Sequence, residues 1–481
     1  MLGGIFLHNT VSSSISENIR IFREYFPKNL TADIVFDEFS IGGKKACFCF
    51  VNGSSNTEVM VKIQMTLLSL TKDEVSHDKD MQDFMARHIP LNDKKLERDF
   101  TKLSTALLWA MSILFIDGFD SAVILDTKRY PSRSIEEPEK NKTMRGPRDG
   151  FCENVFFNTA LIRRRIKSTS LAFESFDIGY ETKTRVILAY MSDKCDKTLL
   201  EKIRKKLGNM NIASLTLSQQ TLTDNLFNTS ITKILNPFPK VRYVERPDTA
   251  ASMLVEGKIG ILCDTTPSAI FLPVNLYDMI EETDDYYFPP LTASYLRILR
   301  VAMLFVSVFL SPLWLLALEY PEALPRSLEF LLVDSKAFIP VWLQLIIVEV
   351  MMDALKIASL NTPNTISNSL SVVSGLLLSD FAITAGWLVP QTILYSAISS
   401  IANFIPTNYE LSYAFKFWRM ALIAFSAIFG LKGFFMGVAL FIIILILNKT
   451  EDNRSYLYPF VPKDKRGILK LFIRTEKGKE Q

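Results

Sequence analysis

Three charged residues, Glu349, Asp353 and Lys356, interrupt a hydrophobic segment that spans residues 337–356. Their spacings of four and three place all three on one stripe of a helix. Charges at membrane depth are costly, so such side chains face protein, water or one another. Repeated around an oligomeric ring, the two acids would line a pathway for cations. Alternatively, Lys356 pairs with Asp353 in the same chain, and the group anchors the helix near the membrane surface.

A second cluster of charges forms the basic end of a helix predicted over residues 151–167, and consists of Arg163, Arg164 and Arg165. Guanidinium groups match the geometry of phosphates, so the cluster could bind anionic lipid headgroups or other phosphates. It could equally be a solvated helix end or form salt bridges at a subunit interface. The residues alone leave both interpretations open.

The sequence lacks the motifs of nucleotide-binding proteins, metalloproteins and common enzymes. It has no G-x-x-x-x-G-K-[ST] loop, no complete G-x-G-x-x-G in the soluble part, no G-x-S-x-G and no H-E-x-x-H. Five cysteines without a C-x-x-C and only three histidines argue against a zinc site. A net charge of +3 argues against a nucleic-acid binder. We therefore expect no catalytic residues, no cofactor, no metal and no nucleic-acid partner.

Charged residues are distributed unevenly along the chain. Residues 301–447 contain only eight acidic and six basic side chains, although the whole chain has 51 Asp or Glu and 54 Lys or Arg. Because lipid-facing helices must be poor in charge, we expect an all-α transmembrane bundle over residues 295–447, with about four spans. Residues 361–380 leave the count open. They are uncharged but too polar for a lipid-facing helix, and could form a re-entrant or pore-facing segment.

The preceding 294 residues have the mixed helix and strand patterns of an α+β or α/β soluble region with two subdomains. Gly42-Gly43 and Asp117-Gly118 each separate two β-rich runs and predict hairpin turns. We divide this soluble region into residues 1–98 and 99–294, and assign residues 448–481 to a basic cytosolic tail. The chain shows no signal peptide at its start, so both termini should be cytosolic.

A set of short motifs follows in order from residue 130 onward. A Glu-Pro pair precedes R-G-x-R-x-G-F-x-E, an asparagine and a run of arginines, and P-F-P and E-R-P-D come later. These motifs closely resemble the signature of the spore germination receptor A-subunit family, over about residues 40–475. FLSPLWLL at 309–316 and YPFVP at 458–462 are similar to the family's stage V sporulation protein AF branch. The signature positions singled out here are Glu137, Arg145, Gly146, Arg148, Glu153, Arg163, Arg164, Arg165, Arg246 and Asp248.

The resemblance implies a multi-pass protein of the inner membrane of bacterial endospores, which works with other germination membrane proteins. Such proteins are expected to form a homo-oligomeric ring, a pentamer, that releases monovalent cations and amplifies the germination signal. The signature residues would then lie in the ring-forming soluble region or at its subunit interfaces. Glu349 and Asp353, with Lys356 beside them, would face the pore.

Two other classes of function compete with a channel. A non-conducting scaffold or signal-relay subunit predicts that neutralising Glu349 and Asp353 leaves germination intact, whereas changing the three arginines breaks assembly. A secondary transporter would show paired halves with matched broken helices. We find no internal repeat of that kind, so the transporter is the weaker alternative.

Overall fold

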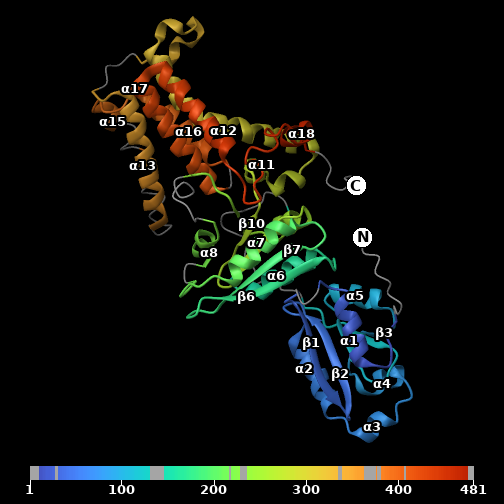
Figure 1. The fold of residues 1–481 in the computed structure, drawn as a ribbon. Coiled ribbons are helices and arrows are strands. Elements are labelled where there is room, and N and C mark those ends of the chain that lie inside the picture. The colour runs from blue at the N-terminus through green and yellow to red at the C-terminus, as the bar shows by residue number, and fades with distance from the viewer. Residues whose placement is uncertain are drawn as a thin grey trace. The chain divides into compact units, whose positions relative to one another are not determined.

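The computed structural model describes residues 10–27, 31–129, 146–215, 218–227, 236–333, 338–361, 375, 381–405 and 408–474. The chain forms two units. One consists of Met1–Ile231 and Val241–Pro273, and the other of Thr232–Lys240 and Val274–Gln481. The first unit contains two antiparallel sheets, and the second is helical (Figure 1).

The first sheet has the strand order β1-β2-β4-β5-β3, with every neighbouring pair antiparallel. Gly42 and Gly43 have positive φ angles of 53° and 85°, which lets the chain turn tightly between β1 and β2. The turn at Asp117-Gly118 joins β4 to β5, so both predicted hairpins are confirmed. The strands are β1 Ile34–Ile41, β2 Lys44–Val51, β3 Lys94–Glu97, β4 Ser112–Ile116 and β5 Ala122–Leu125.

Helices cover both faces of this sheet because successive side chains of its central strands point to opposite faces. On β2, Cys47 and Cys49 pack in the core that contains Phe22 of α1, whereas Phe48 packs in the core that contains Phe84 of α4. The first face is covered by α1 (Ile15–Glu24) and α5 (Phe100–Leu108). The second is covered by α2 (Thr57–Leu68), α3 (Lys72–Ser76) and α4 (Met81–His88).

The expected division of the soluble region at residues 98 and 99 falls inside this sheet. Strands β4 and β5 follow residue 99 in sequence, yet β4 pairs with β2 and β5 pairs with β3. The first sheet therefore extends to Leu125. The pairing of β2 with β4 is long-range, because helices α2, α3 and α4 lie between the two strands in the sequence.

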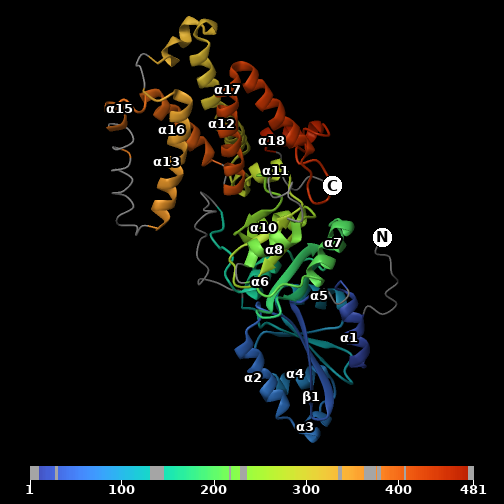
Figure 2. The ribbon, with the colours of Figure 1, turned by 60° about the vertical axis from the view of Figure 1, so that its left-hand side comes forward.

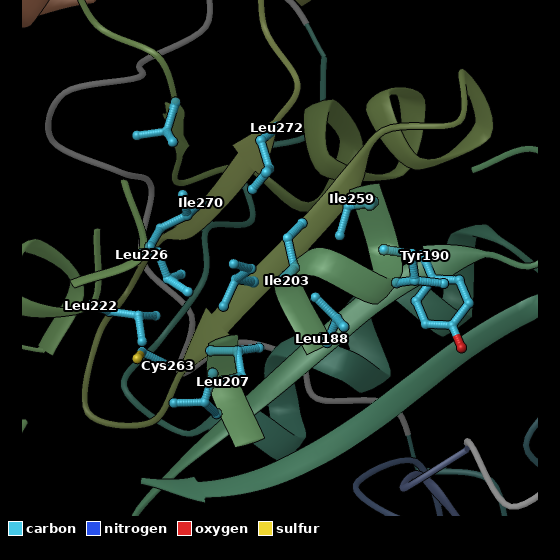
Figure 3. Close-up of a cluster of buried hydrophobic side chains, with 14 of the residues drawn as sticks. Leu188, Tyr190, Ile203, Leu207, Leu222, Leu226, Ile259, Cys263, Ile270 and Leu272 are labelled. Atoms are coloured by element: carbon cyan, nitrogen blue, oxygen red, sulfur yellow. The ribbon is translucent and has the colours of Figure 1, made fainter. Parts of the chain in front are cut away.

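The second sheet has the order β6-β7-β9-β10-β8 and is also antiparallel. Its strands are β6 Leu171–Ile178, β7 Thr184–Met191, β8 Arg242–Val244, β9 Ile259–Cys263 and β10 Ala269–Leu272. One face packs on α7 (Lys197–Gly208) and α8 (Ser218–Phe227), where Ile203 and Leu222 lie in one apolar cluster with Leu188 and Ile270 (Figure 3). Helices α6 (Val155–Arg165) and α10 (Pro247–Val255) pack against each other and against strands of the sheet.

In the second unit, the segment from Val274 onward starts with the short helix α11 (Leu276–Ile280) and continues into α12 (Pro290–Glu319). The other α-helices in the described part of this unit are α13 (Val341–Asn361), α15 (Ala382–Thr384), α16 (Pro390–Asn403), α17 (Tyr409–Leu447) and α18 (Lys465–Phe472), with 3-10 turns at Thr283–Tyr286, Pro321–Ala323 and Arg326–Leu331. Two of the described helices, α12 and α17, are long and apolar enough to cross a membrane. The four expected spans stay a prediction.

Helix α17 reverses direction at Gly430. The ring of Trp418 lies 5.3 Å from the ring of Phe441. In a straight helix these residues would be about 35 Å apart at 1.5 Å per residue. Gly430 has φ 57° and ψ −140°, a conformation outside the helical region that suits glycine. Residues 409–429 and 431–447 therefore form an antiparallel helical hairpin, whose legs can be followed in the red part of Figure 2.

Candidate functional site

Helices α13 and α17 bring two acids and two bases together. The Lys416 ammonium lies 2.7 Å from the Asp353 carboxylate and 3.2 Å from the Glu349 carboxylate. The Arg419 guanidinium donates a hydrogen bond to the same Glu349 carboxylate at 2.8 Å. Formally the four charges cancel, and we call this group the ion cluster.

Three members of the ion cluster are removed from solvent. Arg419, Glu349 and Lys416 are 0%, 1% and 4% exposed, whereas the Asp353 side chain is 32% exposed. Buried ionised groups are tolerated when opposite charges and hydrogen bonds compensate them. The cluster therefore combines a buried, paired acid in Glu349 with a partly exposed acid in Asp353.

Arg419 also connects the ion cluster to two further helices. Its Nη1 donates to the backbone carbonyl of Ser307 on α12 and, at 3.5 Å, to that of Ser399 on α16. The hydroxyl groups of Ser311 and Ser399 lie 3.0 Å apart beside it. One guanidinium thus contacts α12, α13 and α16 from its position on α17. This arrangement uses the fork geometry of arginine, which a lysine lacks.

Lys356 occupies a different environment from the one that its sequence spacing suggests. Its ammonium lies 4.2 Å from the centre of the Phe404 ring and 5.1 Å from that of Tyr413, which are cation–π distances. Within the described residues, Asp353 forms its ion pair with Lys416. The described residues therefore do not show the alternative salt bridge between Lys356 and Asp353.

Two buried polar atoms of the ion cluster, Oε1 of Glu349 and Nε of Arg419, make no hydrogen bond to any described residue. Unpaired buried polar atoms are costly, so these two atoms mark where the cluster could accept or donate further hydrogen bonds. In the described part of the chain, no group of three or more His, Cys, Asp or Glu side chains could hold a metal ion.

The sequence interpretation identified the acids of the ion cluster but missed its bases. Lys416 and Arg419 lie three residues apart, so they share a helix face, within an otherwise apolar segment. That pattern is complementary to the acids at 349 and 353, which lie four residues apart. The signal was available, since charges at membrane depth are expected to find partners.

The three signature arginines at the end of α6 have different surroundings. Arg163 is buried and donates from Nε to Asp33 at 2.8 Å, and from its two terminal nitrogens to the carbonyls of Ser168 and Leu171, each at 3.0 Å. Arg164 is exposed. Arg163 therefore stabilises the interior of its own chain. A role at a subunit interface stays a prediction for Arg164.

Other signature residues form local ion pairs in the first unit. Arg165 donates to both carboxylate oxygens of Asp149, at 2.6 and 2.7 Å, and Arg246 pairs with Asp248 at 2.6 Å. These bidentate or buried pairs fix the loops that flank α6 and α10. Arg148 and Glu153 are exposed, Gly146 has φ 128°, and Glu137 and Arg145 lie outside the described residues.

The chain matches the family model described as Bacillus/Clostridium GerA spore germination protein over residues 20–480. It is 29% identical to stage V sporulation protein AF of Bacillus subtilis over 471 residues, which cover 96% of this chain and 94% of that protein. It is 27% identical to spore germination protein KA of Bacillus subtilis over 473 residues, covering 97% and 85% of the two chains.

A solved structure is also similar: the N-terminal domain of the A subunit of the Bacillus megaterium spore germinant receptor GerK3. The match has a TM-score of 0.43 and 24% identity, and covers 55% of this chain and 97% of that chain. The family match extends through both units, from the signature around α6 to the helices that hold the ion cluster. The chain belongs to the GerA family of spore germination proteins.

Proposed function

We propose that this chain is a membrane subunit of the spore germination machinery, and that copies of it form an oligomeric channel for monovalent cations that amplifies the germination signal. The observation that supports a channel is the position of Asp353. This acid lies on an apolar helix and stays 32% exposed although Lys416 holds it at 2.7 Å. A ring of such carboxylates would attract cations and repel anions.

Glu349, Asp353 and Lys356, which lie on one stripe of α13, take separate roles in this proposal. Asp353 faces the pore, with Lys356 one turn further along the same helix. Glu349 supports α13 from inside the bundle, because its carboxylate is buried and already bound by Lys416 and Arg419. Glu349 is therefore a positioning residue, and its loss should affect assembly before it affects conduction.

Four crossings of the endospore inner membrane are consistent with the helix lengths. Helix α12 has 30 residues, α13 has 21, and the two legs of α17 are residues 409–429 and 431–447. Each leg or helix reaches about 25 Å or more at 1.5 Å per residue, close to the thickness of a bilayer core. Helix α16 has 14 residues and would be too short to cross alone. An even number of crossings keeps both termini on the same side of the membrane, which in this proposal is the cytosol.

Ion flux through the purified full-length chain in liposomes tests the channel. We expect potassium efflux from the wild type and efflux on the order of tenfold slower from Asp353→Asn, because the ring loses its fixed charge. Asp353→Glu should retain most of the flux. Glu322→Gln removes an acid from the loop after α12 and is the matched control. Flux that is identical in the wild type and Asp353→Asn would contradict the assignment of Asp353.

The second candidate is a non-conducting scaffold or signal-relay subunit. One observation favours it: both acids of α13 are ion-paired within their own chain, as a purely structural cluster would be. The scaffold predicts no flux from an oligomeric wild-type protein, with or without other germination proteins. It also predicts that Asp353→Asn leaves spore germination unchanged.

A further inference from the structure

An apolar cavity of about 330 Å³ lies in the second unit, among α11, α12, α17 and α18. Its walls include Leu304 and Val308 of α12, Phe441 and Leu445 of α17, and Leu471 of α18. The remaining lining residues are also aliphatic or aromatic. A cavity of this composition can hold a hydrocarbon chain, and it offers almost nothing that could bind a polar ligand.

The cavity lies where the apolar helices approach their charged ends. It is lined by residues 301–309 in the middle of α12 and by residues near the end of α17, and α12 carries Arg297 and Arg300 just before residue 301. Leu291, Tyr295 and Ile298 on the same end of α12 are exposed. Exposed apolar and tyrosine side chains at a helix entry are typical of the boundary between lipid and water.

Helix α18 supplies positive charge beside the cavity. Its sequence KRGILKLF contains three bases and no acid. Leu471 is buried at the cavity, whereas Leu469, Lys465 and Arg466 are exposed. Short amphipathic helices of this composition lie in the membrane interface and attract anionic lipids.

The bases at the start of α12 are not free to fulfil this role. Arg297 pairs with Asp285 at 3.0 Å and with Glu281 at 3.1 Å, and Arg300 pairs with Asp285 at 3.1 Å. The charge that a ligand would meet therefore comes from α18. An apolar cavity with an adjacent basic helix is complementary to a molecule with an acyl chain and a phosphate.

We infer that this cavity binds one acyl chain of an anionic glycerophospholipid from the bilayer, with Lys465 and Arg466 of α18 contacting the lipid phosphate. The inference goes beyond the proposed channel and does not depend on conduction. It would make the packing of α12, α17 and α18 sensitive to the lipid composition of the membrane.

Native mass spectrometry of the delipidated full-length protein tests the inference, with dioleoyl phosphatidylglycerol and dioleoyl phosphatidylcholine as probes. We expect the wild type to retain phosphatidylglycerol on the order of tenfold more tightly than phosphatidylcholine. The double variant Lys465→Gln/Arg466→Gln should lose this preference. Lys197→Gln/Lys205→Gln on α7 removes the same charge from the first unit and should keep it.

A second pair of variants tests the cavity itself. Ile442→Trp adds bulk at a half-exposed lining position, and Leu445→Phe adds bulk at a buried one. At least one should fold, as judged by size-exclusion chromatography, and should retain less of both lipids. If a cavity-filling variant folds and retains as much lipid as the wild type does, the inference is overturned. A wild type that retains neither lipid would overturn it too.

Discussion

Arg419 and Glu349 are separated by 70 residues in sequence, yet the guanidinium of one donates to the carboxylate of the other at 2.8 Å in the interior of a helical bundle. The same guanidinium reaches the Ser307 carbonyl on α12 and the Ser399 carbonyl on α16. A single side chain thereby connects four helices, so its removal should lower the stability of the whole helical bundle.

Replacing one member of the Arg419–Glu349 pair should destabilise the chain more than replacing both members. Arg419→Leu leaves Glu349 with only Lys416, and Glu349→Leu leaves Arg419 buried without its carboxylate. Each single change should destabilise the chain by about 3–5 kcal/mol, because it leaves a buried charge uncompensated. The double change Glu349→Leu/Arg419→Leu should recover part of the loss. Thermal unfolding in detergent measures all three, and strictly additive losses would contradict the coupling.

Gly430→Ala should destabilise the helical hairpin of α17. The φ of 57° is unfavourable for alanine, and a Cβ atom would lie 2.8 Å from Glu319 Oε1 and Tyr320 Oη. We expect a cost of about 1–3 kcal/mol, read as a lower midpoint of thermal unfolding. Gly208→Ala at the end of α7 is the control, since among the described residues no atom beyond its own stretch of helix lies within 4 Å of the added Cβ. An unchanged midpoint of thermal unfolding for Gly430→Ala would argue against the change of direction of α17 at Gly430.

Arg163→Leu should destabilise the first unit. The change leaves the Asp33 carboxylate buried and removes the donors to the Ser168 and Leu171 carbonyls. We expect a loss of about 3–5 kcal/mol, detected as faster proteolysis of residues 31–215 in the full chain. Arg20→Gln, which removes an exposed pair with Glu24, should cost less than about 1 kcal/mol. Similar proteolysis of the two variants would refute a structural role for Arg163.

The thiol of Cys263 should resist alkylation at neutral pH. Burial, and secondarily the negative charge of Asp264, raise its pKa from 9.0 to about 12. Because the folded pKa is raised, the thiol contributes stability that is present below pH 9 and is lost as the pH rises toward 12. Iodoacetamide at pH 8 should modify the partly exposed Cys152 and spare Cys263. Peptide mapping by mass spectrometry checks this, and prompt labelling of Cys263 in folded protein would count against the buried strand.

Local signals in the sequence were sufficient for part of the fold. Gly-Gly and Asp-Gly pairs predicted two hairpins, since tight turns depend on a few neighbouring residues. The division at residue 98 was misplaced because β2 pairs with β4 across a helical excursion, and such pairing has no local signature. The acids of the ion cluster were found from their spacing on one helix. Their partners were missed because Lys416 and Arg419 meet them only through the packing of α13 on α17.

The ion cluster also has a consequence for biogenesis. Synthesis proceeds from the N-terminus, so in the proposed four-span topology the acids of α13 would reach the membrane before Lys416 and Arg419 do. A lone basic residue at the centre of a helix raises the cost of translocon insertion by about 3 kcal/mol. Residues 409–429 of α17 carry both bases, and the free-energy cost of inserting them would fall once the carboxylates of α13 are present to pair with them. In that topology α13 would supply the carboxylates that lower the insertion cost of the later helix, and the order of the two helices in the sequence would favour their assembly.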